Sequence, residues 1–251
     1  MHGAVGQNGH AAVTMKPIAA APRRAVQAYE AIRDGICDGS LEAGARLVQE
    51  ELAAALDVSR QPIQQALALL KSDGLIVESG ARGLYVAPLD PDGTAQRYQI
   101  RLVLDELAAR LVAERAAASP QFGEELRREG AAMLEKGWAA AGRGADREAV
   151  AFDVAFHSFL YDMSGNPLIR STADPHWNYV RRAMIGVMRH AKRGDIVWRQ
   201  HGEILDALAR GDVEGGVERA GAHVRGAQRA LFASIAETTG AEPPTARNAA
   251  P

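Results

Sequence analysis

The chain has 251 residues, of which 47% are hydrophobic and 24% charged, and its formal net charge is −2. This composition is ordinary for a soluble globular protein, with room for one large domain or two small ones. The single cysteine, Cys37, excludes an intramolecular disulfide. No apolar run approaches the roughly 18–20 residues that span a bilayer, and the N-terminus does not resemble a signal peptide. We therefore expect a cytoplasmic protein without membrane contact.

The beginning of the chain separates into an irregular segment and a helix. Residues 1–21 are rich in alanine, glycine and polar residues without a hydrophobic period, so we expect a disordered tail. An apolar stripe then predicts a helix over about 23–38, ended by an Asp-Gly-Ser turn. The inward face of this helix is expected to carry Val26, Tyr29, Ile32 and Ile36.

Residues 44–88 carry two short helical patterns and a hairpin pattern in direct succession, GARLVQEELAAALDVSRQPIQQALALLKSDGLIVESGARGLYVAPL. Helices are predicted over roughly 49–56 and after Ser59, which is a good N-cap, with Pro62 in the first turn. Two apolar triplets flank Ser-Gly-Ala-Arg-Gly and predict a two-stranded wing. This order of elements indicates a winged helix-turn-helix that binds DNA, in a domain over 22–88. The buried face of its later helix should comprise Ile63, Ala66, Leu67 and Leu70.

The overall charge of this module does not favour DNA binding, because residues 22–90 hold seven basic and ten acidic side chains. Affinity for DNA must therefore come from where the charges lie. The open side of the later helix and the tip of the wing are the expected contact surface. The candidate DNA-binding residues are Ser59, Arg60, Gln61, Gln64, Gln65, Arg82 and Gly83.

Residues 92–236 have an almost wholly helical pattern, broken at turns that contain glycine or proline. Helices are expected near 92–118, 120–141, 146–164, 167–190, 195–210 and 213–236. The predicted fold class is mainly α, a winged helix-turn-helix followed by an all-α bundle of six to seven helices. Residues 237–251 are expected to be a second disordered tail.

Metal-ligand side chains occupy helix faces of this second domain that should be apolar. Asp153 and His157 are four residues apart and share one helical face, while His201 and His223 fall on the apolar stripes of two later helices. A buried carboxylate and unsatisfied imidazoles are costly, and a divalent cation offsets that cost. One carboxylate and three imidazoles suit Zn²⁺, Ni²⁺, Mn²⁺ or Fe²⁺. The alternative is that each histidine is a core residue with one hydrogen bond.

The chain resembles the GntR family of bacterial transcription regulators, in its FadR-like branch with an FCD-type sensor domain. Residues 23–88 resemble the family's winged helix through LVQEELAAALDVSRQPIQQALALLKSDGLI and RGLYV. Residues 92–236 resemble the FCD domain through RLVLDELAARLVA, FDVAFHSFL with SGNPLI, HGEILDAL followed by GD, and AGAHV. The resemblance implies a homodimer on a palindromic double-stranded DNA operator, with the third helix in the major groove and Arg60 in contact with DNA.

The resemblance also implies ligands for the sensor domain. Many FCD domains hold a divalent metal through one aspartate and three histidines, which correspond here to Asp153, His157, His201 and His223. The metal then coordinates a small carboxylate effector. Arg101 matches a family arginine that lies close to the pocket, and Asn166 and Arg181 are further candidates for effector binding.

Some positions depart from the family pattern SR-x-P-V-R-E-A-L. Gln64 stands where a second arginine is usual, and Gln65 where an acid is usual. Arginine favours bidentate contact with guanine, whereas glutamine can pair with adenine, so we expect a shifted operator sequence. Asp57 stands where glycine is frequent, and aspartate tolerates that turn geometry. Asp105 replaces the usual glutamate four residues after Arg101, with little expected consequence.

Together these features predict a ligand-responsive transcription regulator, a repressor rather than an activator, and not an enzyme. Two alternatives stay open from the sequence. The first is a metal-dependent enzyme built on the helical bundle, although no clear general base lies beside the metal-ligand residues and the winged helix would be surplus. The second is a regulator whose polar cluster binds no metal.

Overall fold

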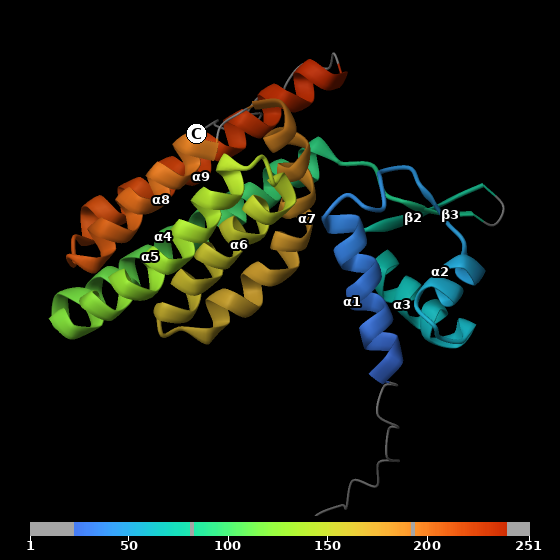
Figure 1. Ribbon diagram of the computed structural model, residues 1–251, viewed down its shortest axis with the longest axis horizontal. Coiled ribbons are helices and arrows are strands. Elements are labelled where there is room, and N and C mark those ends of the chain that lie inside the picture. The colour runs from blue at the N-terminus through green and yellow to red at the C-terminus, as the bar shows by residue number, and fades with distance from the viewer. Residues whose placement is uncertain (1–22, 81–82, 192–193, 240–251) are drawn as a thin grey trace, which may run out of the picture.

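The computed structural model describes residues 23–80, 83–191 and 194–239, and of 186–191 and 235–239 the backbone alone. The predicted tail over 1–21 and Arg82 lie outside the described residues. Within them the predicted fold class is confirmed, since a small winged helix precedes a bundle of long helices (Figure 1). Among the helices in these ranges, none combines the length and the apolarity that crossing a membrane requires.

The N-terminal part folds as a helix-turn-helix with a wing. Its elements in chain order are α1 (Arg23–Cys37), β1 (Arg46–Leu47), α2 (Gln49–Ala55), α3 (Arg60–Ser72), β2 (Ile76–Ser79) and β3 (Gly83–Val86). The strands form an antiparallel sheet in the order β1-β3-β2. β1 is not predicted, because two residues are too few for a hydrophobic period. Asp57 adopts the left-handed backbone of the turn before α3, with φ of 50°.

The core of the winged helix lies between α1 and α3. The predicted inner face of α3 is confirmed, because all its residues are buried, namely Ile63, Ala66, Leu67 and Leu70. The prediction for α1 is wrong at Val26, which is 45% exposed, whereas Ala25 and Ala28 face inward. The small alanine side chains let α1 pack closely against α3, so Ala25 and Ala28 face inward and the larger Val26 stays exposed.

The second part of the chain is a bundle of long helices. They are α4 (Pro91–Ala118), α5 (Pro120–Gly142), α6 (Asp146–Met163), α7 (Pro167–Ala191), α8 (Gly194–Ala209) and α9 (Val213–Thr239). Asp90 and Ser119 cap α4 and α5 by accepting hydrogen bonds from first-turn amides. α9 continues to residue 239, past the predicted end at 236. α4 packs along α9, and α5 packs along α6 and α8.

Helix α7 joins the two parts of the molecule. It packs against α4, α6 and α9 on one side and against α1 on the other, as Figure 1 shows. Cys37 Sγ donates to the carbonyl of Asn178 at 2.9 Å, and Arg181 pairs with Asp34 Oδ1 at 3.3 Å. The Arg182 guanidinium donates to the carbonyl of Ala87 at the end of the wing. Helix α7 is therefore in direct contact with both the bundle and the winged helix.

Glycine at 137 sets the spacing between α5 and α8. A Cβ at Gly137 would overlap the indole of Trp198, which is 1% exposed. We expect Gly137→Ala to destabilise the fold by about 1–3 kcal/mol through overpacking. Gly202→Ala, in a helix position with nothing within 4 Å of the added Cβ, should instead stabilise by about 0.5–1 kcal/mol. Chemical denaturation measures both, and a Gly137→Ala variant as stable as the wild type would contradict this packing.

Candidate metal centre and nucleic-acid interface

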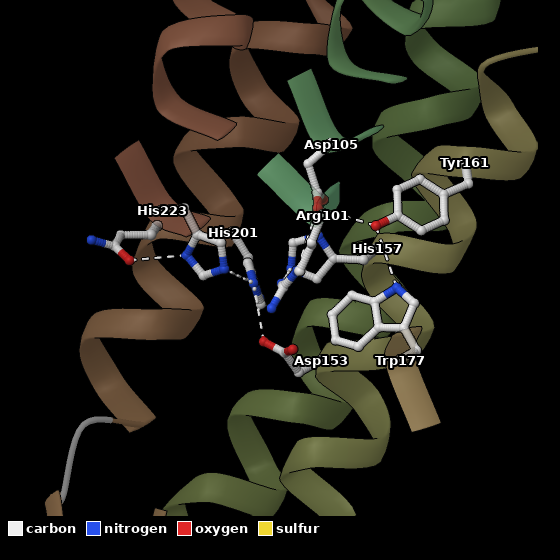
Figure 2. A network of polar contacts seen from close by, with 9 residues as sticks. Arg101, Asp105, Asp153, His157, Tyr161, Trp177, His201 and His223 are labelled. Carbon is white, nitrogen blue, oxygen red and sulfur yellow. Dashed lines mark hydrogen bonds and ion pairs between the residues drawn. The ribbon is translucent and has the colours of Figure 1, made fainter. Parts of the chain in front are cut away.

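Four metal-ligand side chains from three helices meet inside the bundle (Figure 2). Asp153 and His157 come from α6, His201 from α8 and His223 from α9. One ligand atom from each lies within 4.8 Å of the others, and each residue is at most 3% exposed. The structure thus brings together the complete predicted metal set.

Apolar and aromatic neighbours hold these side chains in place. On α6 the four-residue spacing puts Asp153 and His157 on one face, and the intervening Phe156 stacks on the His201 ring at 4.5 Å between centroids. Trp198 meets the same imidazole edge-on at 5.0 Å. This dry packing fixes the ring planes and excludes solvent from the ligand atoms.

Hydrogen bonds orient two of the imidazoles. His157 Nδ1 lies 2.6 Å from Asp105 Oδ1, and His223 Nδ1 lies 3.0 Å from Gln200 Oε1. Both acceptors place the ring proton on Nδ1, which leaves each Nε2 lone pair for the cluster. Nε2 of His223 lies 3.2 Å from Nε2 of His201.

The polar groups at the centre are poorly satisfied. His201 Nε2 lies 3.3 Å from Asp153 Oδ1 without hydrogen-bond geometry, and in the described part of the chain neither Asp153 oxygen has a hydrogen-bond partner. Burial raises the pKa of Asp153. Burial, followed by the neighbouring imidazoles, lowers the pKa of His201 well below its usual value, and burial likewise lowers that of His223. A divalent cation would satisfy these atoms, so the residues fit a metal.

A second cluster of polar side chains, built around Arg101 and Asp105, lies against the metal-ligand cluster. Arg101 Nη2 is 2.9 Å from His157 Nε2, and Arg101 Nε is 3.3 Å from Asp105 Oδ2. The guanidinium lies over the Trp177 ring, 4.0 Å from its centroid. Tyr161 donates to Asp105 Oδ2 at 3.1 Å and accepts from the Trp177 indole at 3.3 Å. Figure 2 shows this network joining α4, α6 and α7 beside the metal-ligand cluster.

Asp105, at the position where glutamate is usual in the family, is a buried member of this network. It is 4% exposed and contacts both Arg101 and His157. Burial alone would raise the pKa of Asp105, but the charges of His157 and Arg101 outweigh burial and lower it. The sequence offered one signal for this role, the four-residue spacing from Arg101, and none for Gln200 or Tyr161.

An apolar cavity of about 70 Å³ adjoins the cluster at His223. It lies between α4, α7, α8 and α9, and its lining includes Tyr98, Met184, Val197, Gln200, Ala227 and Leu231. The Tyr98 hydroxyl is buried and has no hydrogen-bond partner among the described residues. A ligand that reaches the cluster from this side would bury an apolar part against these side chains.

Two predicted effector residues lie elsewhere. Asn166 stands just before α7, where its side-chain oxygen accepts from the Leu168 amide at 3.1 Å. Arg181 faces α1 and pairs with Asp34. The structure therefore brings Arg101 to the cluster, but neither Asn166 nor Arg181.

The candidate DNA-contacting residues of α3 lie mainly on the outer surface. Ser59, Arg60, Gln61 and Gln64 are exposed and Gln65 is half-buried. Ser59 has the extended backbone of an N-cap, yet its side chain makes no capping hydrogen bond. Arg60 Nη2 pairs with Glu50 Oε1 at 3.2 Å, and both side chains are largely exposed. Gly83 is a buried residue that begins β3.

Comparison with known proteins covers both parts of the chain. Residues 24–86 match the bacterial regulatory proteins of the gntR family, and residues 96–226 match the FCD domain. The HTH-type transcriptional regulator YdhC of Bacillus subtilis is 26% identical over 79% of this chain and 86% of its own length. The HTH-type transcriptional repressor NanR of Salmonella newport is 26% identical over 65% of this chain and 68% of its own.

A solved structure shows the same fold. E. coli McbR/YncC superposes with a TM-score of 0.73 at 21% identity, over 86% of this chain and all of its own (100%).

An HTH-type transcriptional regulator from an unstable DNA locus of Streptomyces ambofaciens is 31% identical over 74% of this chain and 75% of its own length. The winged helix, the helical bundle and these matches together show that the chain belongs to the GntR family of DNA-binding transcription regulators, with an FCD domain as its C-terminal part.

Proposed function

We propose that the chain is a repressor that binds a palindromic operator as a homodimer and releases or tightens it in response to a small carboxylate, sensed through a divalent cation. The observation that carries the proposal is the buried cluster of metal-ligand side chains beside the Arg101 guanidinium, in which neither Asp153 oxygen has a hydrogen-bond partner among the described residues. The name of NanR, a transcriptional repressor, supports repression. The metal-enzyme alternative loses its support, because the family consists of DNA-binding regulators.

The cation would be held by the carboxylate of Asp153 and by Nε2 of His157, His201 and His223. Imidazole and carboxylate together suit Zn²⁺, Ni²⁺, Mn²⁺ or Fe²⁺. When bound, the metal supplies a positive centre that a carboxylate can coordinate. Asp105 and Gln200 orient two of the rings, as outer hydrogen-bond partners do in metal sites.

The effector carboxylate has a second expected partner in Arg101. Nε and Nη1 of this buried guanidinium have no hydrogen-bond partner among the described residues. Charge-assisted pairs of guanidinium and carboxylate are strong and directional. The cavity beside His223 offers room for an apolar part of the effector.

Helix α7 supplies the route from effector to DNA. Trp177 contacts Arg101, and the next two turns of the helix contact α1 and the end of the wing. A ligand that binds one arrangement of α7 better than another would shift the orientation of the winged helix by that difference in affinity.

The homodimer is supported by an exposed apolar stripe on α4. Ile100, Val103 and Leu107 are 40%, 63% and 38% exposed and follow helical spacing along one face. Apolar side chains gathered on a surface mark interaction sites. A second copy of the chain would cover the stripe and match the two-fold symmetry of a palindromic operator.

The dimer proposal predicts that Val103→Glu yields monomers. The substitution introduces a charge that docking of a second copy would bury, and such burial is costly. Light scattering during gel filtration measures the mass. Leu168→Glu, at a 70% exposed position at the start of α7, is the matched control and should keep the wild-type mass. A Val103→Glu variant that stays dimeric would place the interface elsewhere.

The metal proposal predicts that protein purified without chelator carries a metal ion that His223→Ala loses. Asp105→Asn should keep the ligands but weaken metal affinity about 10–100-fold, because a neutral amide oxygen replaces the charged carboxylate that orients His157. Elemental analysis and metal titration measure both effects. His176→Ala, outside the cluster, is the control. Equal metal content in His223→Ala and wild type would remove the site.

The operator proposal predicts that Arg60→Ala weakens binding by about 1–3 kcal/mol, while Arg128→Ala on α5 leaves it unchanged. Selection from random DNA should return a sequence that differs from the usual family operator. Gln64→Arg should move the preference at one position per half-site toward guanine. Recovery of the usual family operator by the wild-type chain would contradict the assigned role of Gln64.

A further inference from the structure

We propose that Arg101 blocks the metal site until a carboxylate draws it away, so that metal and carboxylate bind cooperatively. The inference rests on the proposed function, because it concerns the same site. It adds that the Arg101 guanidinium opposes metal binding and that a carboxylate removes this opposition.

The conflict lies at one atom, Nε2 of His157. Its partner nitrogen, Nδ1, faces the Asp105 carboxylate at 2.6 Å and therefore carries the ring proton. Nε2 has a single lone pair, which is 2.9 Å from Arg101 Nη2. One lone pair cannot both accept from a guanidinium and coordinate a cation. Metal binding through His157 thus requires Arg101 to leave.

Arg101 is held in this position but is incompletely satisfied. The guanidinium is stacked on Trp177 and paired with Asp105, and the residue is 3% exposed. Its Nε and Nη1 nevertheless have no hydrogen-bond partner in the described part of the chain. A carboxylate offers two oxygens in the geometry that a guanidinium prefers. It can therefore replace His157 as the partner of Arg101.

The exchange couples the two ligands. A carboxylate that takes Arg101 frees Nε2 of His157 for the metal, and a metal that takes Nε2 frees Arg101 for the carboxylate. Each ligand must then raise the affinity of the other by the same factor. The chain would therefore respond to lower concentrations of the carboxylate where metal is present.

The test measures the affinity of the full chain for Co²⁺ from the visible absorption of the bound ion, first without carboxylate. Arg101→Met should bind Co²⁺ at least about tenfold more tightly than wild type, because a charge-assisted hydrogen bond no longer occupies Nε2 of His157. Saturating butanoate should tighten Co²⁺ binding to wild type, and butanamide should not. In Arg101→Met the butanoate effect should shrink to the part that direct coordination of Co²⁺ by the carboxylate supplies.

A double-mutant cycle separates occupancy of Nε2 from simple charge repulsion. In a His157→Ala background, Arg101→Met should no longer tighten Co²⁺ binding, whereas repulsion would persist there. Arg97→Met is the matched control, since this arginine lies one turn earlier on α4 and over Tyr179 instead, and its Co²⁺ affinity should equal that of wild type. Thermal unfolding checks that each variant folds, and the butanoate effect on wild type needs no variant.

The outcomes distinguish this inference from the proposed function. If Arg101→Met and wild type bind Co²⁺ with equal affinity, the metal site stands and the block by Arg101 is wrong. If the gain persists in the His157→Ala background, repulsion replaces the exchange. If neither wild type nor Arg101→Met binds Co²⁺, the metal part of the proposed function fails, and this inference fails with it.

Discussion

Six ionisable side chains from four helices meet where water does not reach, and each needs a partner inside the protein. They are Arg101, Asp105, Asp153, His157, His201 and His223. Transfer of such groups out of water costs several kcal/mol each unless they are paired or coordinate a metal. Arg101, Asp105 and His157 pair with one another, but in the described part of the chain Arg101 Nη1, both Asp153 oxygens and His201 Nδ1 have no hydrogen-bond partner. The proposed cation would offset the cost of burying the Asp153 carboxylate among α4, α6, α8 and α9.

The same constraint explains how the sensor can be sensitive. In the proposed exchange, the His157 lone pair is shared and the Arg101 guanidinium is under-satisfied, so a carboxylate can favour a second arrangement of the network. Trp177 stacks on that guanidinium and belongs to α7, whose other side touches α1. The cluster and the winged helix are thus connected through one helix, α7.

Most of the fold follows from the sequence because its signals are local. Glycine and proline mark the helix ends, and the 3.6-residue period identifies the inner face of α3 and all four metal-ligand residues. The sequence does not predict contacts between side chains of different helices, because the period within one helix does not specify them. Gln200 and Asp105 become partners of histidines only when α8 meets α9 and α4 meets α6. Arg181 was assigned to the effector pocket, but its side of α7 faces α1, and this depends on how the two parts dock.

The ion pair between Arg60 and Glu50 bears on how the protein would distinguish its operator from other DNA. The arginine on the outer face of α3 carries its own internal counterion, on a module with more acidic than basic residues. In the proposed DNA contact, Arg60 exchanges Glu50 for a phosphate, and the loss of this exposed ion pair costs up to about 1 kcal/mol. On random DNA that loss would be offset by a phosphate contact alone, whereas on the operator base contacts would add to it, so the exchange would favour discrimination.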